Sequence, residues 1–188
     1  LVPADGSTPA RKLTHTKGGE SGAAFSPDGK TLAFSARRDG DEAPQIYLLP
    51  LEGGEARRLT TLSTGASSPK FRPDGKAVLF ETEFQEGAAN LDEQTKLADE
   101  QKARKDTARV YETFPVRFWN AWLEKKEPVL GWQELDGAIP TIVRVAPLRG
   151  SFAGGITEAL NPTWTPDGQG IVFDALAIFL FPWVLVLR

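Results

Sequence analysis

Few residues of this chain combine the type and spacing that catalysis or metal binding requires. The one histidine, His15, lies in a polar run with no partner that would complete a triad or a metal site. Gly19-Glu20-Ser21-Gly22-Ala23 is similar to a nucleophile elbow, but it lacks the final glycine and leads into a strand pattern instead of a helix. We therefore predict no catalytic residue, no metal ligand and no cofactor in these 188 residues.

The side chains best suited to binding lie in the aromatic-rich segment 110–123, VYETFPVRFWNAWL. Two interpretations stay open. The rings anchor this segment to the rest of the fold, or some of them line a pocket in which Glu112 or Arg117 grips a substrate terminus. The candidate substrate-binding residues are Glu112, Arg117, Trp119 and Trp122.

The composition is that of a soluble globular protein, with 40% hydrophobic and 25% charged residues and a net charge of −3. This balance provides no basic surface for nucleic acid. The chain has no cysteine, which fits the bacterial cytoplasm and the periplasm, with the periplasm slightly favoured. It also has no methionine and no signal peptide at its start, so we expect a processed chain or an internal fragment.

A motif centred on Pro-Asp-Gly occurs three times. The copies are FSPDGKTLAF at 25–34, FRPDGKAVLF at 71–80 and WTPDGQGIVF at 164–173. Proline fixes φ at the second turn position, the aspartate bonds back to the local backbone, and alternating apolar residues follow. Each copy therefore predicts two short strands joined by a tight hairpin.

A second element repeats with the same period of 46 residues. LPLEGGEARRLT at 49–60 matches ADGSTPARKLT at 4–14, just as the motif at 71–80 follows that at 25–34. Residues 45–51 read as a third strand and residues 56–60 as a short outer strand. Four antiparallel strands in such a period are the signature of a β-propeller blade.

The repeats divide the chain into blades. We expect an all-β partial β-propeller with two full blades, two partial ones and a helical insertion. Because such an arc does not close a ring, we expect it to be part of a larger domain. The predicted ranges are the end of a blade at 1–14, a blade at 21–60, a blade at 67–148 with an insertion at 85–127, and the start of a blade at 161–174.

Two segments depart from the repeat. Residues 89–108 are rich in charged residues and alanine, which predicts a solvated helix or a disordered excursion. Residues 175–188 form an anomalous apolar tail, for which a shifted reading frame or a foreign end is the first explanation and a buried strand the second. The tail is shorter than the roughly 20 residues of a membrane span and Pro182 interrupts it, so we expect no membrane segment.

The repeat resembles the Pro-Asp-Gly propeller repeat that the TolB family shares with the N-terminal domains of prolyl oligopeptidase-type serine peptidases. The resemblance rests on the three Pro-Asp-Gly hairpins and on GGEARRLT at 53–60, and it covers residues 1–84 and 128–174. The insertion, with its run from Val110 to Trp122, is similar to bacterial members of the dipeptidyl- and acylaminoacyl-peptidase branch.

In such peptidases the propeller caps a C-terminal α/β-hydrolase domain with a Ser–Asp–His triad and filters short peptides. The resemblance thus implies a non-catalytic propeller portion of a serine peptidase, with the hydrolase domain and peptides as partners. No residue of such a triad lies in this chain. The alternative is a TolB-like scaffold that binds protein partners.

Overall fold

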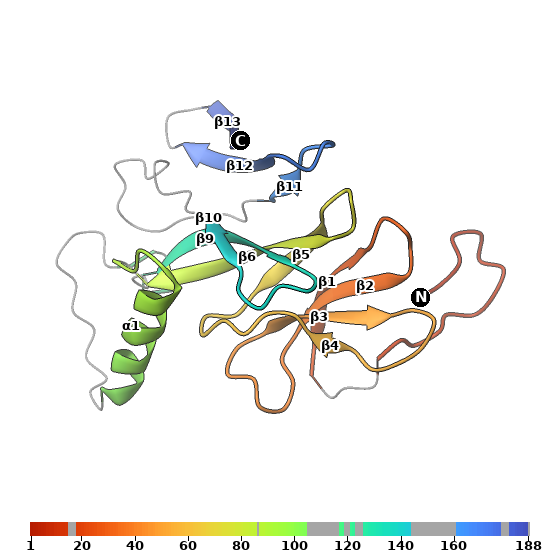
Figure 1. Cartoon of the computed structure of the whole chain (residues 1–188), viewed down its shortest axis with the longest axis horizontal. Helices are drawn as coiled ribbons and strands as arrows, with labels where there is room; N and C mark the ends of the chain where they lie inside the picture. Colours follow the sequence, from red (N-terminus) through yellow and green to blue (C-terminus); the bar gives the residue numbers. More distant parts are fainter. Residues whose placement is uncertain are drawn as a thin grey trace.

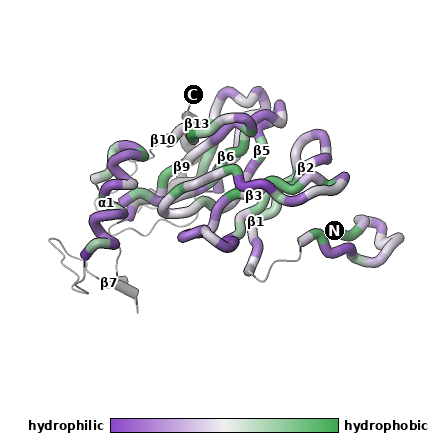
Figure 2. Tube along the Cα trace, turned by 60° about the horizontal axis from the view of Figure 1, so that its bottom comes forward, coloured by the Kyte–Doolittle hydropathy of each residue, from purple (hydrophilic) through white to green (hydrophobic). Residues whose placement is uncertain are grey.

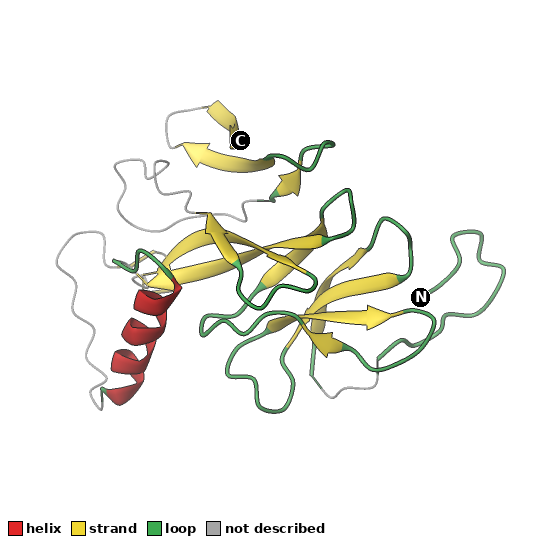
Figure 3. Ribbon diagram, viewed as in Figure 1, coloured by secondary structure: helices red, strands yellow, loops and turns green. Residues whose placement is uncertain are grey.

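The computed structural model describes residues 1–14, 18–85, 87–104, 117–118, 121–122, 126–143, 161–177 and 181–187. In these residues, three antiparallel sheets of three or four strands follow one another along the chain, and a helix lies beside the second of them (Figures 1 and 3). No described helix has the length and hydrophobicity needed to cross a membrane.

The first blade is a four-stranded sheet in the order β1-β2-β3-β4. Its strands are β1 (Glu20–Phe25), β2 (Thr31–Ala36), β3 (Gln45–Pro50) and β4 (Arg57–Arg58). Residues 1–14 precede it and contain no strand, although the two ends of this segment meet through reciprocal backbone hydrogen bonds of 2.7 Å between Leu1 and Arg11. Their assignment to a preceding blade stays a prediction.

The second blade has the same four-stranded plan but longer middle strands. Its strands are β5 (Ser67–Phe71), β6 (Ala77–Gln85), β9 (Lys126–Glu134) and β10 (Thr141–Val143). The pairing of β6 with β9 runs from Ala77↔Glu134 to Gln85↔Lys126. The helix α1 (Leu91–Ala103) and the short hairpin of β7 (Arg117–Phe118) and β8 (Ala121–Trp122) belong to the insertion between these two strands.

The third sheet contains β11 (Thr163–Trp164), β12 (Ile171–Ala177) and β13 (Phe181–Leu187), in that order. β13 comes from the anomalous apolar tail and pairs with β12 from Ile171↔Leu187 to Ala177↔Phe181. The tail therefore takes the place that β3 has in the first blade, and whether it is a genuine buried strand or a foreign end stays a prediction.

The three Pro-Asp-Gly turns have the same hydrogen bonds. In each turn the glycine N–H donates to the carbonyl three residues earlier, at 2.8 Å. The aspartate Oδ1 accepts the N–H two residues further on, at 3.0 Å for Asp28, 2.9 Å for Asp74 and 3.0 Å for Asp167. The prediction that these aspartates fold back on their own turn is confirmed.

Neighbouring turns touch in a repeated way. A Cβ on Gly75 would lie 3.6 Å from Cδ of Pro27 in the first turn, and a Cβ on Gly168 would lie 3.6 Å from Cδ of Pro73 in the second. The turns thus form a row along one edge of the blades, which we call the turn rim. Since the same contact recurs, the rotation from one blade to the next is built into the repeat.

The chain has a left-handed residue at one equivalent position before each motif, and in the first two blades this position is a bulge in the innermost strand. Gly22, Ser68 and Asn161 each lie three residues before the aromatic residue of the motif and have φ values of 63°, 53° and 41°. The pairing of β1 with β2 and of β5 with β6 shifts register there. Asparagine and glycine adopt this left-handed conformation readily, but serine rarely does, so the conformation comes from the repeated fold.

The faces of the sheets pack against each other in two seams. In the first seam, between the first and second blades, the buried residues include Ala33, Ile46, Leu48, Val78 and Phe80. In the second seam, between the second blade and the third sheet, they are Leu79, Leu130, Ile171 and Phe173. Figure 2 shows these hydrophobic strands in contrast to the mostly hydrophilic α1.

One glycine of the second blade leaves room for a ring that is buried in the first seam. A Cβ on Gly131 of β9 would lie 2.4 Å from the ring of Phe80, its partner residue on β6. Phe80 is fully buried in the first seam. An isolated glycine in a strand pattern marks such a close approach. These features give an all-β partial propeller with four-stranded blades and a helical insertion, as the sequence predicted.

Candidate functional site

The turn rim and the insertion lie at opposite ends of the blades. In an antiparallel sheet, the connection from β5 to β6 and the connection from β6 to β9 must leave from opposite ends of β6. The insertion therefore emerges on the side away from the Pro-Asp-Gly turns, where Figure 1 shows α1. The connection 37–44 of the first blade leaves on the same side, and we call this edge the insertion rim.

Helix α1 begins with a variant of the capping box, in which Glu93 bonds to the residue before the N-cap Asn90. The Glu93 N–H donates to the Asn90 side chain at 2.9 Å, and the Glu93 carboxylate accepts the Ala89 N–H at 2.7 Å. This reciprocal bonding fixes where the helix starts, close to the ends of β6 and β9. Of the two alternatives that the sequence left open for residues 89–108, a helix and a disordered excursion, the structure has a helix over Leu91–Ala103.

The end of β6 holds α1 through two glutamines. The Gln85 N–H donates to Oε1 of Gln94 at 2.5 Å, and the Gln85 side chain donates to Oε1 of Gln101 at 2.7 Å. Gln94 is 2% exposed, and its Nε2 is buried without a hydrogen-bond partner. Leu91 and Leu97 of the helix pack against the buried residues Phe84, Ala88 and Val129. The helix is therefore docked on the sheet and not merely solvated.

In the first blade, a buried carboxylate organises the connection 37–44. The side chain of Asp41 is 1% exposed and accepts hydrogen bonds from the Tyr47 hydroxyl at 2.7 Å, Arg58 Nη1 at 2.7 Å and the Arg38 N–H at 3.0 Å. Burial by itself would raise the pKa of Asp41, but these three donors lower it below its ordinary value. The cluster is a structural anchor, since the three donors come from different parts of the first blade and all bond to Asp41.

The same cluster fixes two further side chains. Burial and the hydrogen bond to Asp41 raise the pKa of Tyr47 to about 12, so the hydroxyl stays protonated and donates. The guanidinium carbon of Arg38 lies 4.4 Å from the centre of the Tyr47 ring, a cation–π contact. Beside the cluster, Glu42 accepts a hydrogen bond from Lys102 near the end of α1. The insertion rim therefore includes contacts between two blades.

The predicted binding residues lie in the insertion. Arg117 and Trp122 face each other across the β7–β8 hairpin as backbone partners. Glu112 and Trp119 lie outside the described residues. The proposed contact of these four residues with a substrate stays a prediction.

The sequence predicted no catalytic residue and no metal ligand, and the structure describes some of the residues behind that prediction. His15 lies outside the described residues. Ser21 is in β1, and a strand and a tight turn follow it, so the context of a nucleophile elbow is missing. Among the residues that the structure describes, no three His, Cys, Asp or Glu side chains group as metal ligands.

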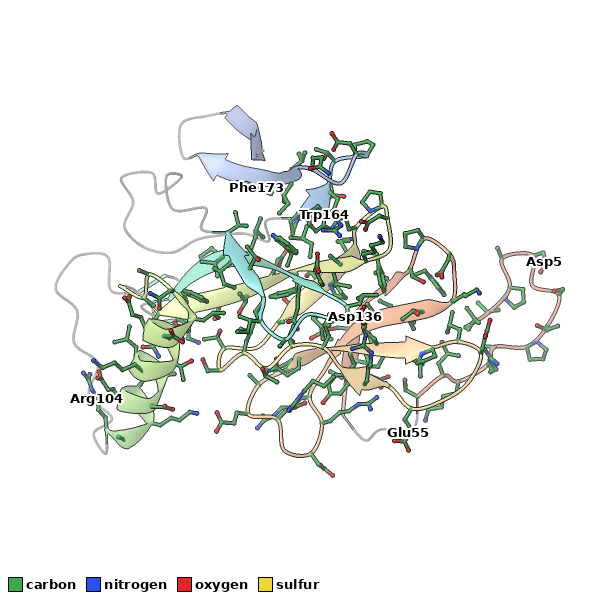
Figure 4. The ribbon with its side chains drawn as sticks, viewed as in Figure 1. Asp5, Glu55, Arg104, Asp136, Trp164 and Phe173 are labelled. Carbon is green, nitrogen blue, oxygen red and sulfur yellow. The ribbon has the colours of Figure 1, made fainter. Side chains whose placement is uncertain are left out.

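A cleft of about 430 Å³ opens in the second seam beside the turn rim. Its walls include Trp132 of β9 and Trp164 of β11 (labelled in Figure 4), and the centres of the two rings are 6.2 Å apart at an interplanar angle of 69°. The guanidinium carbon of Arg72 lies 5.8 Å from the centre of each ring. Arg72 Nε also bonds to Asp74 at 2.9 Å, and this bond lowers the pKa of Asp74.

The polar groups of this cleft bind mainly one another. Arg72 is held by Asp74, and the stem of Arg72 lies against Gly168, where a Cβ would be 3.2 Å away. Trp164 Nε1 donates to the Lys70 carbonyl at 3.2 Å. Sequence reasoning missed this arginine and the buried Asp41. The signal for Arg72 is its position in the motif, where the other copies have Ser26 and Thr165.

Comparison with known proteins gives a family and a relative. The family model described as "PD40: TolB beta propeller domain" matches residues 2–109, more than half of the chain. The protein named "Uncharacterized peptidase YuxL" of Bacillus subtilis (strain 168) is 33% identical over 154 residues. That match covers 80% of this chain and 21% of the relative, so the chain spans about a fifth of the relative's length.

Solved structures share the fold at low sequence identity. TolB from Acinetobacter baumannii superposes with a TM-score of 0.58 at 18% identity, over 98% of this chain and 33% of that one. The acylaminoacyl peptidase of Pyrococcus horikoshii gives 0.56 at 13%, over 90% and 24%. An oligogalacturonate lyase from Vibrio parahaemolyticus gives 0.58 at 14%, over 98% and 40%. Proteins with different functions carry this architecture, so the superpositions establish the fold alone.

The family follows from agreement between the repeat, the sheets and the family model. The Pro-Asp-Gly turns and four-stranded blades of residues 20–143 are the elements of such a propeller, and the family model covers the first blade and part of the second. The chain belongs to the TolB β-propeller domain family.

Proposed function

We propose that this chain is the propeller portion of a prolyl oligopeptidase-type serine peptidase, in which it caps an α/β-hydrolase domain and admits short peptides. The observation that carries the proposal is the 33% identity with the Bacillus subtilis peptidase over 154 residues. This match extends beyond the part of the chain that the TolB family model covers. Among the residues that the structure describes, the polar clusters serve turns and seams, so we place catalysis in the hydrolase domain.

The insertion rim is the edge that we propose to face the hydrolase domain. It carries α1 and the β7–β8 hairpin, whereas the turn rim is a row of short, similar turns. Loops on a rigid scaffold are where binding residues concentrate. In this arrangement Glu112 or Arg117 would pair with a charged terminus of a peptide, and Trp119 and Trp122 would contact its apolar side chains.

The experiment is hydrolysis of peptides of graded length by the full-length protein that contains this chain. We expect cleavage of short peptide substrates, inhibition by a serine-directed covalent reagent, and no cleavage of a folded protein substrate. Replacing Arg117 with Met should raise KM for short peptides more than it lowers kcat.

A matched control is Arg11→Met, which changes an exposed arginine of the N-terminal segment, outside the insertion. Cleavage of large proteins at the rate of short peptides would refute filtering. Absence of any serine-dependent hydrolysis would refute the peptidase and favour the second candidate, a TolB-like scaffold for protein partners, which the family model supports.

A further inference from the structure

Helix α1 is fastened at two places that belong to different blades. In the second blade, the end of β6 holds Gln94 and Gln101 through Gln85. In the first blade, Glu42 accepts a hydrogen bond from Lys102 in the last turn of the helix. The helix therefore crosses the first seam on the insertion rim.

The anchor in the first blade is firm. Glu42 follows Asp41, whose buried carboxylate binds Tyr47, Arg58 and the Arg38 backbone. Breaking that cluster would leave a buried charge or hydroxyl without partners, which is costly. The loop 37–44 is thus a fixed support, and the exposed side chain of Glu42 projects from it toward α1.

The anchor in the second blade lies next to the predicted binding hairpin. Gln85 pairs with Lys126, the first residue of β9, and β8 ends at Trp122. Only three residues separate Trp122 from Lys126, so the chain between them spans at most about 14 Å. Any displacement of α1 that pulls on Gln85 therefore acts at the base of the hairpin.

We propose that α1 is a brace across the first seam, and that Glu42 and Lys102 are positioning residues for the hairpin that carries Arg117 and Trp122. The brace couples the first blade to the insertion of the second. The inference rests on the proposed function in one respect, that this hairpin contacts a peptide. The position of the hairpin itself is independent of any activity.

The test is hydrogen exchange of the full-length protein at low salt, followed by mass spectrometry on peptides that cover residues 117–122. Glu42→Lys and Lys102→Glu should each speed exchange of this hairpin by about two- to fivefold, because an exposed ion pair contributes modestly. The double charge swap should restore the wild-type rate. Peptides that cover β2 and β3 should exchange as before.

Lys96→Glu is the matched control, since Lys96 is an exposed lysine on the same helix. Salt near 1 M should reduce the effect of the single variants, because the Debye length falls to about 3 Å. Unchanged exchange of residues 117–122 in both single variants would overturn the brace. So would a double swap that exchanges as fast as the single variants.

An activity measurement separates this inference from the proposed function. In a protein that hydrolyses peptides, the single variants should raise KM about two- to fivefold with kcat unchanged, and the double swap should restore KM. If exchange responds as expected but the protein hydrolyses no peptide, the brace stands and the peptidase proposal falls. If the protein hydrolyses peptides but exchange does not respond, the brace falls alone.

Discussion

The two seams are built from equivalent positions of one repeat, yet they are filled differently. The first seam has Ser26 before the turn proline and Leu48 on the third strand, and its core is buried and apolar. The second seam has Arg72 and Trp132 at the same positions and keeps a cleft of about 430 Å³. The larger side chains of the second seam therefore do not pack it more tightly, because a charged group such as Arg72 retains water around it.

The two seams also differ in the hydrogen bonds that cross them. Across the first seam, Gln133 donates to the Leu59 carbonyl at 2.9 Å, and Arg57 donates to the Leu135 carbonyl at 2.9 Å. The second seam relies on Trp164 and on the contacts of Arg72 and Glu81. We expect the first seam to be the stronger of the two, and the following variants test that order.

The largest expected effect is at the centre of the first seam. Phe80→Ala should lower the free energy of unfolding by about 3–5 kcal/mol, because a fully buried ring leaves a cavity. Trp132→Ala in the second seam should cost only about 1–2 kcal/mol, since this side chain is half-buried. Urea unfolding compares the two. Equal losses would show that the seams have equal strength.

The next effect comes from the close approach within the second blade. Gly131→Ala should cost about 1–3 kcal/mol, because the new methyl group would overlap the Phe80 ring. Gly19→Ala, where no atom lies within 4 Å of the new Cβ, is the control and should change stability by less than about 0.5 kcal/mol. Thermal unfolding of both variants suffices. A neutral Gly131→Ala would mean that Phe80 moves aside freely.

A smaller effect is expected from the arginine of the second seam. In a double-mutant cycle, Arg72→Met and Trp164→Leu should show a coupling of about 0.5–1 kcal/mol, because the guanidinium lies over the indole. Lys76→Met with Trp164→Leu is the control pair and should show none. If the losses in the free energy of unfolding are additive in the first cycle, Arg72 serves its turn only and does not stabilise the second seam.

The smallest effect depends on pH. Burial raises the pKa of Glu81 above its ordinary 4.5, while Ser68, the Asn161 N–H and Lys70 partly offset that shift. A raised pKa in the folded state means that stability from Glu81 is complete below about pH 4.5 and is lost as pH rises through the folded value.

Glu81→Gln should therefore stabilise the protein at pH 7 by no more than about 1 kcal/mol, given the half-exposed site, and should change nothing below pH 4.5. Urea unfolding at pH 4 and pH 7 checks the sign. A variant that is less stable than the wild type at pH 7 would show that the ionised carboxylate stabilises the second seam.

The strands and turns of the blades could be predicted from the sequence, because each copy of the repeat contains the same turn residues and the same apolar pattern. Pro-Asp-Gly with an apolar strand on each side forces the same turn three times. The left-handed position before each motif was not predicted, because Gly22, Ser68 and Asn161 differ and only their equivalent place in the repeat relates them. Gly131 carried a usable signal, an isolated glycine within a strand, but its partner Phe80 follows only from the register.

The candidate site was harder to derive. Asp41 lies in the polar run RRDGDE at 37–42, and nothing in that run distinguishes the buried carboxylate from its exposed neighbours. Asp41 lies in a loop, and its burial depends on Tyr47 of β3 and Arg58 of β4, which bond to it. Likewise, the charged composition of residues 89–108 predicted a solvated helix or a disordered excursion, whereas Gln94 is buried and bonds to the backbone of β6.

The most direct test of the proposed function is to read the coding sequence on both sides of these 188 residues. We predict further Pro-Asp-Gly repeats, followed downstream by an α/β-hydrolase domain with a Gly-x-Ser-x-Gly elbow. A reading frame that closes after more propeller repeats, with no hydrolase domain, would contradict the peptidase proposal and leave a binding scaffold in its place.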